Sequence, residues 1–279
     1  MNSPATLPCV AGIGLRAAHY QQVLDTQPDL GWVEVHSENF FGGGAPLHTL
    51  LQVRQNYAVS LHGVGMGLAS PDPLDVQHLG SLRRLCDIVQ PAQVSEHLSW
   101  NAVHGQVIND LLPFPYTQQA LAHVAARVQQ VQETLGRQLL MENLSSYVRF
   151  AQSEMSEGEF LAELVQKTGC GILFDVENLY VNAQNLGVDA HEFIRTIPAH
   201  AVQEYHLAGF SNHDGCLVDT HDHAVCAAVW ELYQTALQHI GVRPTLIEWD
   251  SNIPALSVLQ NEAATAQRLM EQCHEFIRT

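Results

Sequence analysis

Eight short apolar runs recur along the 279-residue sequence, and this repetition is the feature that most restricts the fold. The runs occupy residues 10–16, 31–37, 57–63, 92–98, 137–143, 170–176, 202–208 and 244–250. Between several of them lie stretches with apolar residues at helical spacing, at 117–136, 156–169 and 222–241. Strands that alternate with helices favour a parallel sheet, and eight repeats in a chain of this length favour a closed (β/α)8 barrel. We therefore expect an α/β fold made of one domain over residues 1–279, with 1–9 as a loose N-terminal tail.

Helix boundaries can be read from the residues that flank these stretches. The stretch 156–169 opens with Ser156 and Glu159 at the spacing of a capping box, and it ends at Gly169. The stretch 117–136 ends in the same way at Gly136. These signals predict helices that end where the glycines stand.

The charge of the chain excludes several functions. The formal net charge is −17, with only 12 lysines and arginines. Such a surface repels nucleic acid and anionic membranes, so neither is expected as a partner. No run of about 18 apolar residues predicts a membrane span, and the N-terminus lacks the features of a signal peptide. The six cysteines form no C-x-x-C pair, which is typical of reduced thiols in a cytoplasmic protein.

Polar side chains stand at the ends of most of the predicted strands. They are His36, Glu38, His62, Glu96, His97, Glu142, Asn143, Asp175, His206 and Glu248. In a barrel all strand ends of one kind meet at one mouth, where active sites are built. A single histidine or carboxylate there is more often a hydrogen-bonded structural residue. So many together indicate a site, because each buried, unpaired charge costs several kcal/mol.

The segment "DTHDH", residues 219–223, has two readings: a solvated polar loop or part of a metal site. It follows the seventh predicted strand, so a loop there would hang over the same mouth. The combined ligands are imidazole, carboxylate and amide without thiolate, which favours iron, manganese or zinc. So many candidate ligands exceed the needs of one ion, so we expect two or three ions bridged by carboxylates.

Other segments carry weaker signals. The glycine-rich "FFGGGAP" (40–46) and "GIGLR" lack the pattern of a phosphate-binding loop. We expect 40–46 to be a flexible loop at the mouth. Six histidines in helical or loop stretches are expected on the surface: His48, His78, His104, His123, His191 and His274.

A series of motifs between Gly12 and Pro254 resembles one known family. In order, they are "GIGLR", "EVHSENFFG", "SLHGVGMGLAS", "SEHLSW", "LPFPYT", "MENLSSY", "FDVENLYVNA", "EYHLAGF", "DTHDH" and "LIEWDSNIP". They resemble the multinuclear non-heme iron-dependent oxidative enzymes, which include the methanobactin-biosynthesis oxidase. The resemblance implies a xylose-isomerase-like TIM barrel that holds two or three iron ions. It also implies that the enzyme uses dioxygen to modify cysteines in ribosomally made peptides.

The resemblance also implies roles for individual residues. The metal ligands would be His62, His97, Glu142, Asp175, His206, Asp219, His221 and Glu248, with Asn143 added for a third iron. Among them, Glu142, His221 and Glu248 are the candidate catalytic residues. The candidate substrate-pocket residues are His36, Glu38, Asn39, Asn178 and Asp250. The chain departs from the family at Glu177, where relatives commonly carry asparagine.

Within the family, the chain looks most like the bufferin-maturation subgroup. Members of that subgroup are encoded near small cysteine-rich peptides and a partner protein that presents them. This implies a role in copper stress through modified cysteines, such as thiooxazoles.

Two other classes of function remain open from the residues alone. Barrels with such mouths also serve as sugar isomerases and as trinuclear-zinc endonucleases. The net charge disfavours an endonuclease, and Lys167, the sole lysine, sits at a helix end where an isomerase could not use it. The other class is a non-enzymatic metal store or peptide-binding module. Dioxygen consumption with a peptide would separate it from an oxidase.

Overall fold

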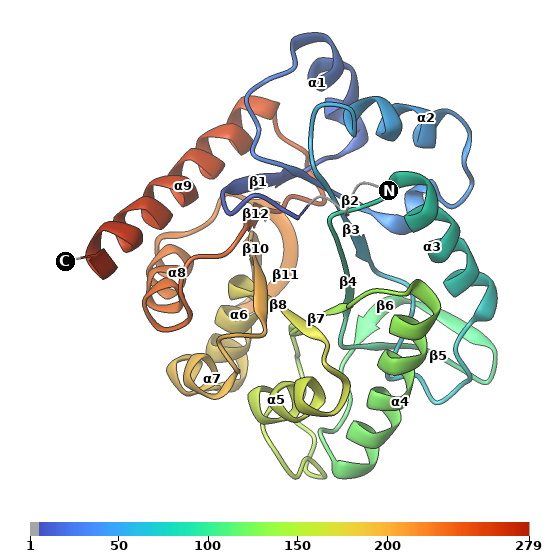
Figure 1. Cartoon of the computed structure of the whole chain (residues 1–279). Coiled ribbons are helices and arrows are strands. Elements are labelled where there is room, and N and C mark those ends of the chain that lie inside the picture. Colours follow the sequence, from blue (N-terminus) through green and yellow to red (C-terminus); the bar gives the residue numbers. More distant parts are fainter. Residues whose placement is uncertain (1–5, 279) are drawn as a thin grey trace.

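A closed barrel of eight parallel strands forms the centre of the computed structural model, which describes residues 6–278 (Figure 1). The barrel strands are β1 (Ala11–Gly14), β2 (Val33–His36), β3 (Val59–Gly63), β4 (Gln93–His97), β7 (Leu140–Glu142), β8 (Gly171–Asp175), β9 (Val202–Leu207) and β12 (Thr245–Ile247). Their order around the barrel is β1-β12-β9-β8-β7-β4-β3-β2. Each predicted apolar run contains one strand, and the predicted barrel is confirmed.

Helices surround the strands as an outer ring (Figure 1). They are η1 (Ala17–His19), α1 (Tyr20–Thr26), η2 (Ser37–Phe40), α2 (Gly44–Val53), α3 (Val76–Val89), α4 (Gln118–Leu135), α5 (Glu157–Thr168), α6 (Val176–Leu186), α7 (Ala190–Thr196), α8 (Ala227–Ile240) and α9 (Leu256–Arg278). Among the residues that the structure describes, none of these helices is long and apolar enough to cross a membrane.

The predicted ends of α4 and α5 are confirmed. Ser156 and Glu159 form a reciprocal capping box at the start of α5. Gly136 and Gly169 follow the two helices with φ of 66° and 67°, a left-handed backbone that glycine adopts without steric cost.

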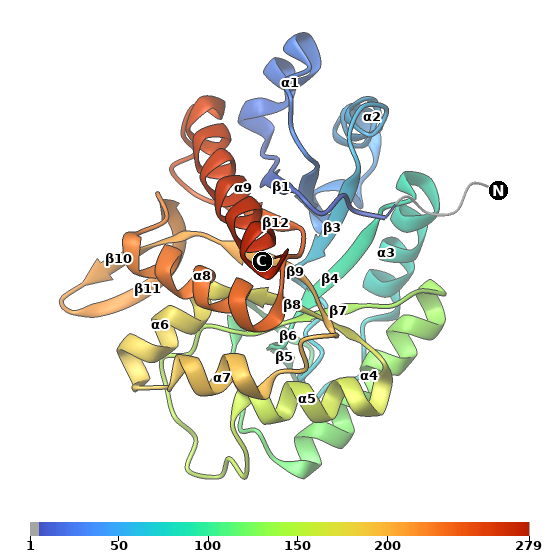
Figure 2. The same cartoon turned by 60° about the vertical axis from the view of Figure 1, so that its left-hand side comes forward.

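Two antiparallel hairpins extend from the barrel, and the sequence analysis missed both. They are β5 (Trp100–Val103) with β6 (Gln106–Leu112), and β10 (Gly209–His213) with β11 (Cys216–His223). The second hairpin stands out from the barrel in Figure 2. Its strands join through Asp214 and Gly215, both with positive φ. Asp-Gly is a strong signal for a two-residue hairpin turn, so this hairpin was readable from the sequence.

This hairpin corrects two predictions. His221 does not lie on a loop but within β11. Helix α8 begins at Ala227 instead of residue 222, because residues 216–223 pair with β10.

The expectation of a flexible loop over 40–46 is also wrong for most of that segment, since η2 ends at Phe40 and α2 begins at Gly44.

Strand alternation separates an apolar outer layer from a polar interior. In β2 and β3, Val33, Val35, Val59 and Leu61 belong to the hydrophobic core, while the residues between them are polar. At the N-terminal side, Leu7 packs against Trp32 and Leu246. Of the expected loose tail 1–9, residues 1–5 lie outside the described chain, and Leu7 is buried.

The capping box of α5 provides a test of the fold. Ser156→Ala removes the hydroxyl that accepts from the Glu159 backbone N–H, at a cost of about 1 kcal/mol. In a chain of this size, thermal unfolding should shift down by about 2–4 °C. Ser257→Ala, in the exposed first turn of α9, is the control and should leave the melting temperature nearly unchanged. Equal melting of both variants would contradict the capping role.

Candidate metal centre

The structure brings six of the predicted strand-end residues together at one end of the barrel. His97, Glu142 and Asp175 are the last residues of their strands, His62 and His206 the last but one, and Glu248 directly follows β12. None exposes more than 7% of its surface. Strand register explains the grouping, because His97 pairs with Glu142 across β4 and β7, and Asp175 pairs with His206 across β8 and β9.

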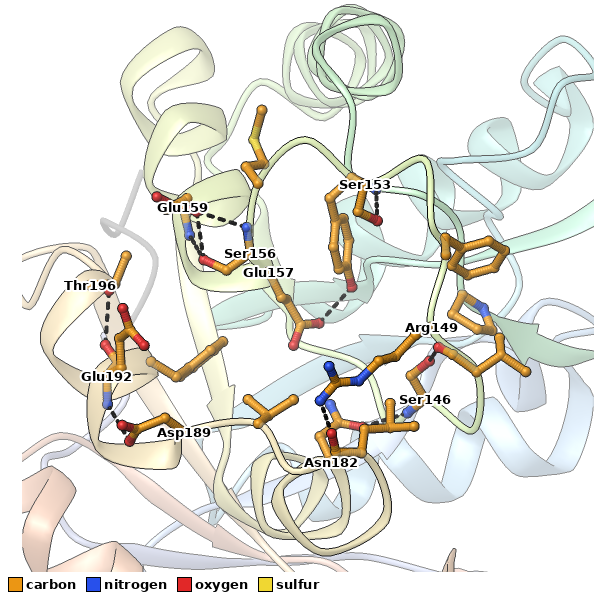
Figure 3. Close-up of a pocket in the computed structure, with 18 of the residues that line it drawn as sticks. Ser146, Arg149, Ser153, Ser156, Glu157, Glu159, Asn182, Asp189, Glu192 and Thr196 are labelled. Atoms are coloured by element: carbon orange, nitrogen blue, oxygen red, sulfur yellow. Dashed lines mark hydrogen bonds between the residues drawn. The ribbon is translucent and has the colours of Figure 1, made fainter.

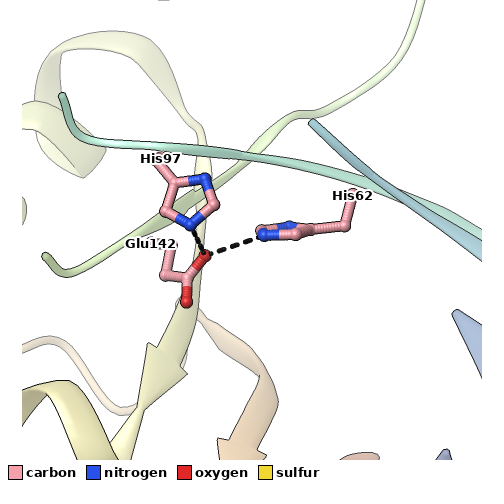
Figure 4. Close-up of side chains that lie close together, drawn as sticks. All are labelled: His62, His97 and Glu142. Carbon is pink, nitrogen blue, oxygen red and sulfur yellow. Dashed lines mark ion pairs between the residues drawn. The ribbon is translucent and has the colours of Figure 1, made fainter. Parts of the chain in front are cut away.

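Glu142 joins two histidines through one oxygen. Its Oε2 lies 3.2 Å from Nε2 of His62 and 3.2 Å from Nε2 of His97 (Figure 4). The other nitrogen of His97 lies 3.0 Å from the carbonyl of Gly63, which can only accept, so Nδ1 carries the proton. Nδ1 of His62 contacts the Ser95 hydroxyl at 2.7 Å. Both rings therefore direct Nε2 at the same carboxylate oxygen.

His206 connects this group to Glu248. Its Nδ1 lies 2.9 Å from Oε2 of Glu248 and 3.8 Å from Oε1 of Glu142. The same Glu248 oxygen lies 3.4 Å from Nδ1 of His221. Glu142 and Glu248 are thus each shared between imidazoles on different elements, as bridging ligands would be.

The β10–β11 hairpin supplies the other side of the centre. Nε2 of His221 lies 2.7 Å from Asp219 and 3.4 Å from Glu177, which comes from the first turn of α6. The Ser145 hydroxyl donates to Asp219. His221 has a φ of 45°, a strained backbone for a residue with a side chain. Its carbonyl accepts a hydrogen bond from the Asp250 N–H, which holds the strained residue in place.

Charge and burial oppose each other throughout the centre. Burial raises the pKa of Glu142 to about 8 and that of Asp175 to about 6. Burial also raises the pKa of Glu177 to about 8, aided by the negative charge of Asp219. Burial opposes the ionisation of Glu248 as well, but His206 and His221 outweigh it and hold its pKa well below the usual range. A bound cation would compensate the carboxylates that burial disfavours.

Several buried polar atoms in the centre make no hydrogen bond within the described chain. They are Oε2 of Glu142, Oδ2 of Asp175, both carboxylate oxygens of Glu177, Nε2 of His206 and Nε2 of His221. Buried polar groups are rarely left without a partner, because each costs about 1–3 kcal/mol. Imidazole nitrogens and carboxylate oxygens that converge in this way fit divalent or trivalent metal ions.

The amides and outer residues take different positions. Both polar atoms of the Asn143 side chain bond the backbone of Asp175, and Asn178 donates to the Asn143 carbonyl. Asn39 is exposed on η2. Glu38 lies away from the main group, where it accepts from the Val64 and Gly65 N–H groups.

Two histidines expected on the surface are partly buried. His78 lies 3.3 Å from Glu38, and His123 contacts the Ser70 carbonyl. His48, His104, His191 and His274 are exposed as expected.

Arg16 is a site residue that the sequence analysis missed. Its guanidinium contacts Asp250, Glu248 and His36. It therefore connects two candidate substrate-pocket residues, His36 and Asp250, to the centre. Arg16 lies two residues after the end of β1 and is the last residue of the predicted run 10–16, so the rule of polar strand ends would have found it. It was passed over because arginine is not a metal ligand.

Glu34 and Glu204 were missed as well. They lie deeper in the barrel than His206. Oε1 of Glu34 is 3.2 Å and Oε1 of Glu204 is 3.5 Å from Nε2 of His206. Each stands two residues before a predicted site histidine, His36 and His206, and so on the same face of its strand. That spacing was the available signal.

Comparison with known proteins identifies the family. Residues 10–271 match the model of the RiPP precursor modification enzymes MbnB/TglH/ChrH. The chain belongs to this family. A UPF0276 protein of Chromobacterium violaceum is 57% identical over 96% of this chain and 97% of its own length. A UPF0276 protein of Acaryochloris marina is 47% identical over 94% of this chain and 95% of its own length.

Solved structures agree with the fold. A D-tagatose 3-epimerase-like protein superposes with a TM-score of 0.63 at 13% identity, covering 96% of this chain and 99% of that one. A xylose isomerase domain protein from Alicyclobacillus acidocaldarius gives 0.58 at 15% identity, with 95% and 100% coverage. At these identities the likeness supports the xylose-isomerase-like barrel and nothing about the reaction.

A cavity of about 420 Å³, lined by none of the residues of the centre, lies between the β7–α5 loop and helices α5 to α7 (Figure 3). Glu157 points into it from the start of α5. One oxygen of Glu157 accepts from the Tyr116 hydroxyl and from the Leu144 N–H. Burial raises the pKa of Glu157 to about 7.

Glu157 gives a pH-dependent prediction for stability. Its folded pKa lies above the unfolded value of about 4.5, so the wild type loses stability as pH rises from there through about 7. Glu157→Gln keeps the accepting oxygen and removes the charge. The variant should melt above the wild type at pH 8, and the difference should vanish near pH 4.5.

Glu159→Gln on the same helix is the contrasting control. Hydrogen bonds from Ser156 lower the pKa of Glu159, so this contribution to stability is present at neutral pH and lost on acidification. Glu159→Gln should therefore melt below the wild type at pH 8. If both variants shifted in the same direction, the assigned environment of Glu157 would be wrong.

Proposed function

We propose that this member of the RiPP-modifying family is a multinuclear iron- and dioxygen-dependent oxidase acting on cysteine residues of a ribosomally made precursor peptide. The observation that carries the proposal is the sharing of Glu142 and Glu248 among four imidazoles in one buried group. Two carboxylates placed in this way suit two or three ions better than one.

The residues divide into two connected groups that would hold the ions. The first is formed by His62, His97 and Glu142 on the barrel. The second is formed by His221 and Asp219 of the hairpin, with Glu177 from α6. Asp175, His206 and Glu248 lie between them, and the Asn143 side-chain oxygen, which already accepts from the Asp175 N–H, would bind through its second lone pair.

Iron is the proposed metal because oxidation of a cysteine without an organic cofactor needs an ion that changes valence, and zinc does not. When bound, the iron would supply the electron transfer to dioxygen and a Lewis acid for the substrate thiolate. The proposed ligands contain no thiolate, so the sulfur in the centre would come from the substrate. The chain itself fixes the imidazoles and carboxylates, and Arg16 compensates the charge of Asp250 and Glu248 at the rim.

The peptide, its partner and its product follow from the family resemblance. We infer a cysteine-containing precursor, presented by a partner protein and converted to a product such as a thiooxazole in a copper-stress response. Sugar isomerisation is the second candidate, supported by the shared barrel. It is disfavoured because Lys167, the sole lysine, is exposed at the end of α5, away from the carboxyl ends of the strands.

Glu142 tests the bridging role. Glu142→Ala should lose more than one iron per chain relative to the wild type, because one carboxylate contacts ligands of two ions. Iron would be counted by elemental analysis after anaerobic reconstitution. Glu157→Gln, which changes a half-buried carboxylate outside the centre, should keep the full iron content. Full iron content in Glu142→Ala would exclude bridging.

His221 tests the oxidase function. His221→Ala should keep the wild-type circular dichroism, since the hairpin lies outside the barrel, but it should fail to change the mass of the cognate peptide. The iron-loaded wild type should consume dioxygen only when that peptide is present. His223→Ala is the matched control, because His223 lies in the same strand with 60% of its side chain exposed. Modification of the peptide by His221→Ala at the wild-type rate would refute the assignment.

A further inference from the structure

Two carboxylates sit beneath the metal centre inside the barrel and face one histidine. Glu34 of β2 and Glu204 of β9 are 1% and 0% exposed. Nε2 of His206 lies 3.2 Å from Oε1 of Glu34 and 3.5 Å from Oε1 of Glu204. The opposite nitrogen, Nδ1, faces Glu248 at 2.9 Å. One imidazole therefore separates the two carboxylates from the centre.

Each carboxylate is held so that one oxygen remains for the histidine. The Ser60 hydroxyl donates to Oε2 of Glu34 at 2.8 Å, and the Gln93 amide donates to Oε2 of Glu204. The Oε1 atoms of both glutamates are buried and accept no aligned hydrogen bond. Nε2 of His206 is buried as well and has no aligned hydrogen-bond partner. Nε2 thus has two carboxylate oxygens within 3.5 Å, while the aligned hydrogen bond of the ring joins Nδ1 to Glu248, the residue that would exchange this contact for a metal ion in the loaded centre.

Stability alone does not explain the arrangement. Two carboxylates that share a single imidazole are costly inside a barrel, where an apolar layer could pack instead. Strand pairing places Glu34 directly beside Ser60, so the supporting hydroxyl is part of the same layer. Both carboxylates of this layer face the same residue, His206.

We propose that Glu34 and Glu204 are positioning residues that hold the His206 Nε2 proton, so that Nδ1 is the nitrogen left for the metal centre. The inference rests on the proposed metal centre and adds a tautomer and an orientation to one ligand. A neutral imidazole has one N–H and one acceptor nitrogen, and the hydrogen bond to one nitrogen decides the role of the other. Carboxylates that hold a ligating histidine in this way also raise its basicity.

His62 and His97 show the same principle with the opposite nitrogen. Their Nδ1 atoms contact Ser95 and the Gly63 carbonyl, and their Nε2 atoms face Glu142. In His206 the ring is reversed, because the supporting groups lie deeper in the barrel. The centre would thus receive Nε2 from two histidines and Nδ1 from the third.

Zinc binding to the metal-free protein tests the proposal without iron, dioxygen or peptide. Apparent affinity would be measured by competition with a chelating dye for wild type, Glu34→Ala and Glu34→Gln. Glu34→Ala should weaken zinc binding by about 10- to 100-fold, the usual effect of removing such a partner. Glu34→Gln keeps an accepting oxygen and should recover most of the affinity. Leu164→Ala, a core change on α5, controls for lost stability and should bind as the wild type does.

Nitrogen NMR of the zinc-loaded, histidine-labelled protein gives a second readout. The His206 signal, identified by its absence in His206→Gln, should show a proton on Nε2 and zinc on Nδ1. Wild-type affinity in Glu34→Ala would overturn the proposal. Zinc on Nε2 would also overturn it and would make Glu34, Glu204 and His206 a metal site of their own.

The zinc experiment separates this proposal from the oxidase function. If the wild type binds zinc and the variants behave as expected, the positioning role stands even where the iron form fails to oxidise a peptide. If the wild type binds no zinc, the positioning role and the metal centre both fall.

Discussion

The contact between Glu142 and two imidazoles is the interaction on which the centre depends. Three consecutive barrel strands, β3, β4 and β7, each place one of these side chains at its carboxyl end. The three side chains are almost fully buried, so water cannot satisfy them. A carboxylate in that position raises the energy of the folded chain unless positive charge faces it. The geometry of the barrel is therefore suited to a cation, and the outer apolar layer must supply the stability that this polar interior does not.

Strand pairing explains why the site is rigid. The register sets His36 beside His62, His97 beside Glu142 and Asp175 beside His206. Backbone hydrogen bonds of a closed barrel leave no free edge along which a strand could shift, so the candidate ligands keep their spacing. One layer deeper in the barrel, strand pairing also sets Glu34 beside Ser60, whose hydroxyl donates to it. Ligands and their supports are thus fixed by a single set of strand pairs.

The sequence predicted the barrel and the gathering of strand-end residues because both depend on local periodicity. Alternating apolar residues and a polar end mark each strand. Because the strands are parallel, their polar ends meet at one face of the barrel. Arg16 stands at the end of the first predicted run, but its contacts with Asp250 and Glu248 could not be predicted, because these residues are more than two hundred positions away in the sequence. The spacing of Glu34 and Glu204 from His36 and His206 was readable, but their meeting at His206 depends on how the non-adjacent strands β2 and β9 face each other across the barrel interior. The hairpin error at His221 was different, because the Asp-Gly turn was readable and was not used.

The β10–β11 hairpin adds candidate ligands that the barrel strands do not supply. The barrel strands supply His62, His97, Glu142, Asp175, His206 and Glu248, whereas Asp219 and His221 come from β11, outside the barrel sheet. Asp250 bonds the strained His221 backbone through its N–H while its carboxylate contacts Arg16. The segment after β12 therefore anchors the hairpin over the mouth and connects it to β1. A likeness to sugar epimerases in the barrel says nothing about this second group of candidate ligands, because the likeness shows the fold alone. The capacity for more than one metal ion would arise where barrel and hairpin meet, at Glu248 between His206 and His221.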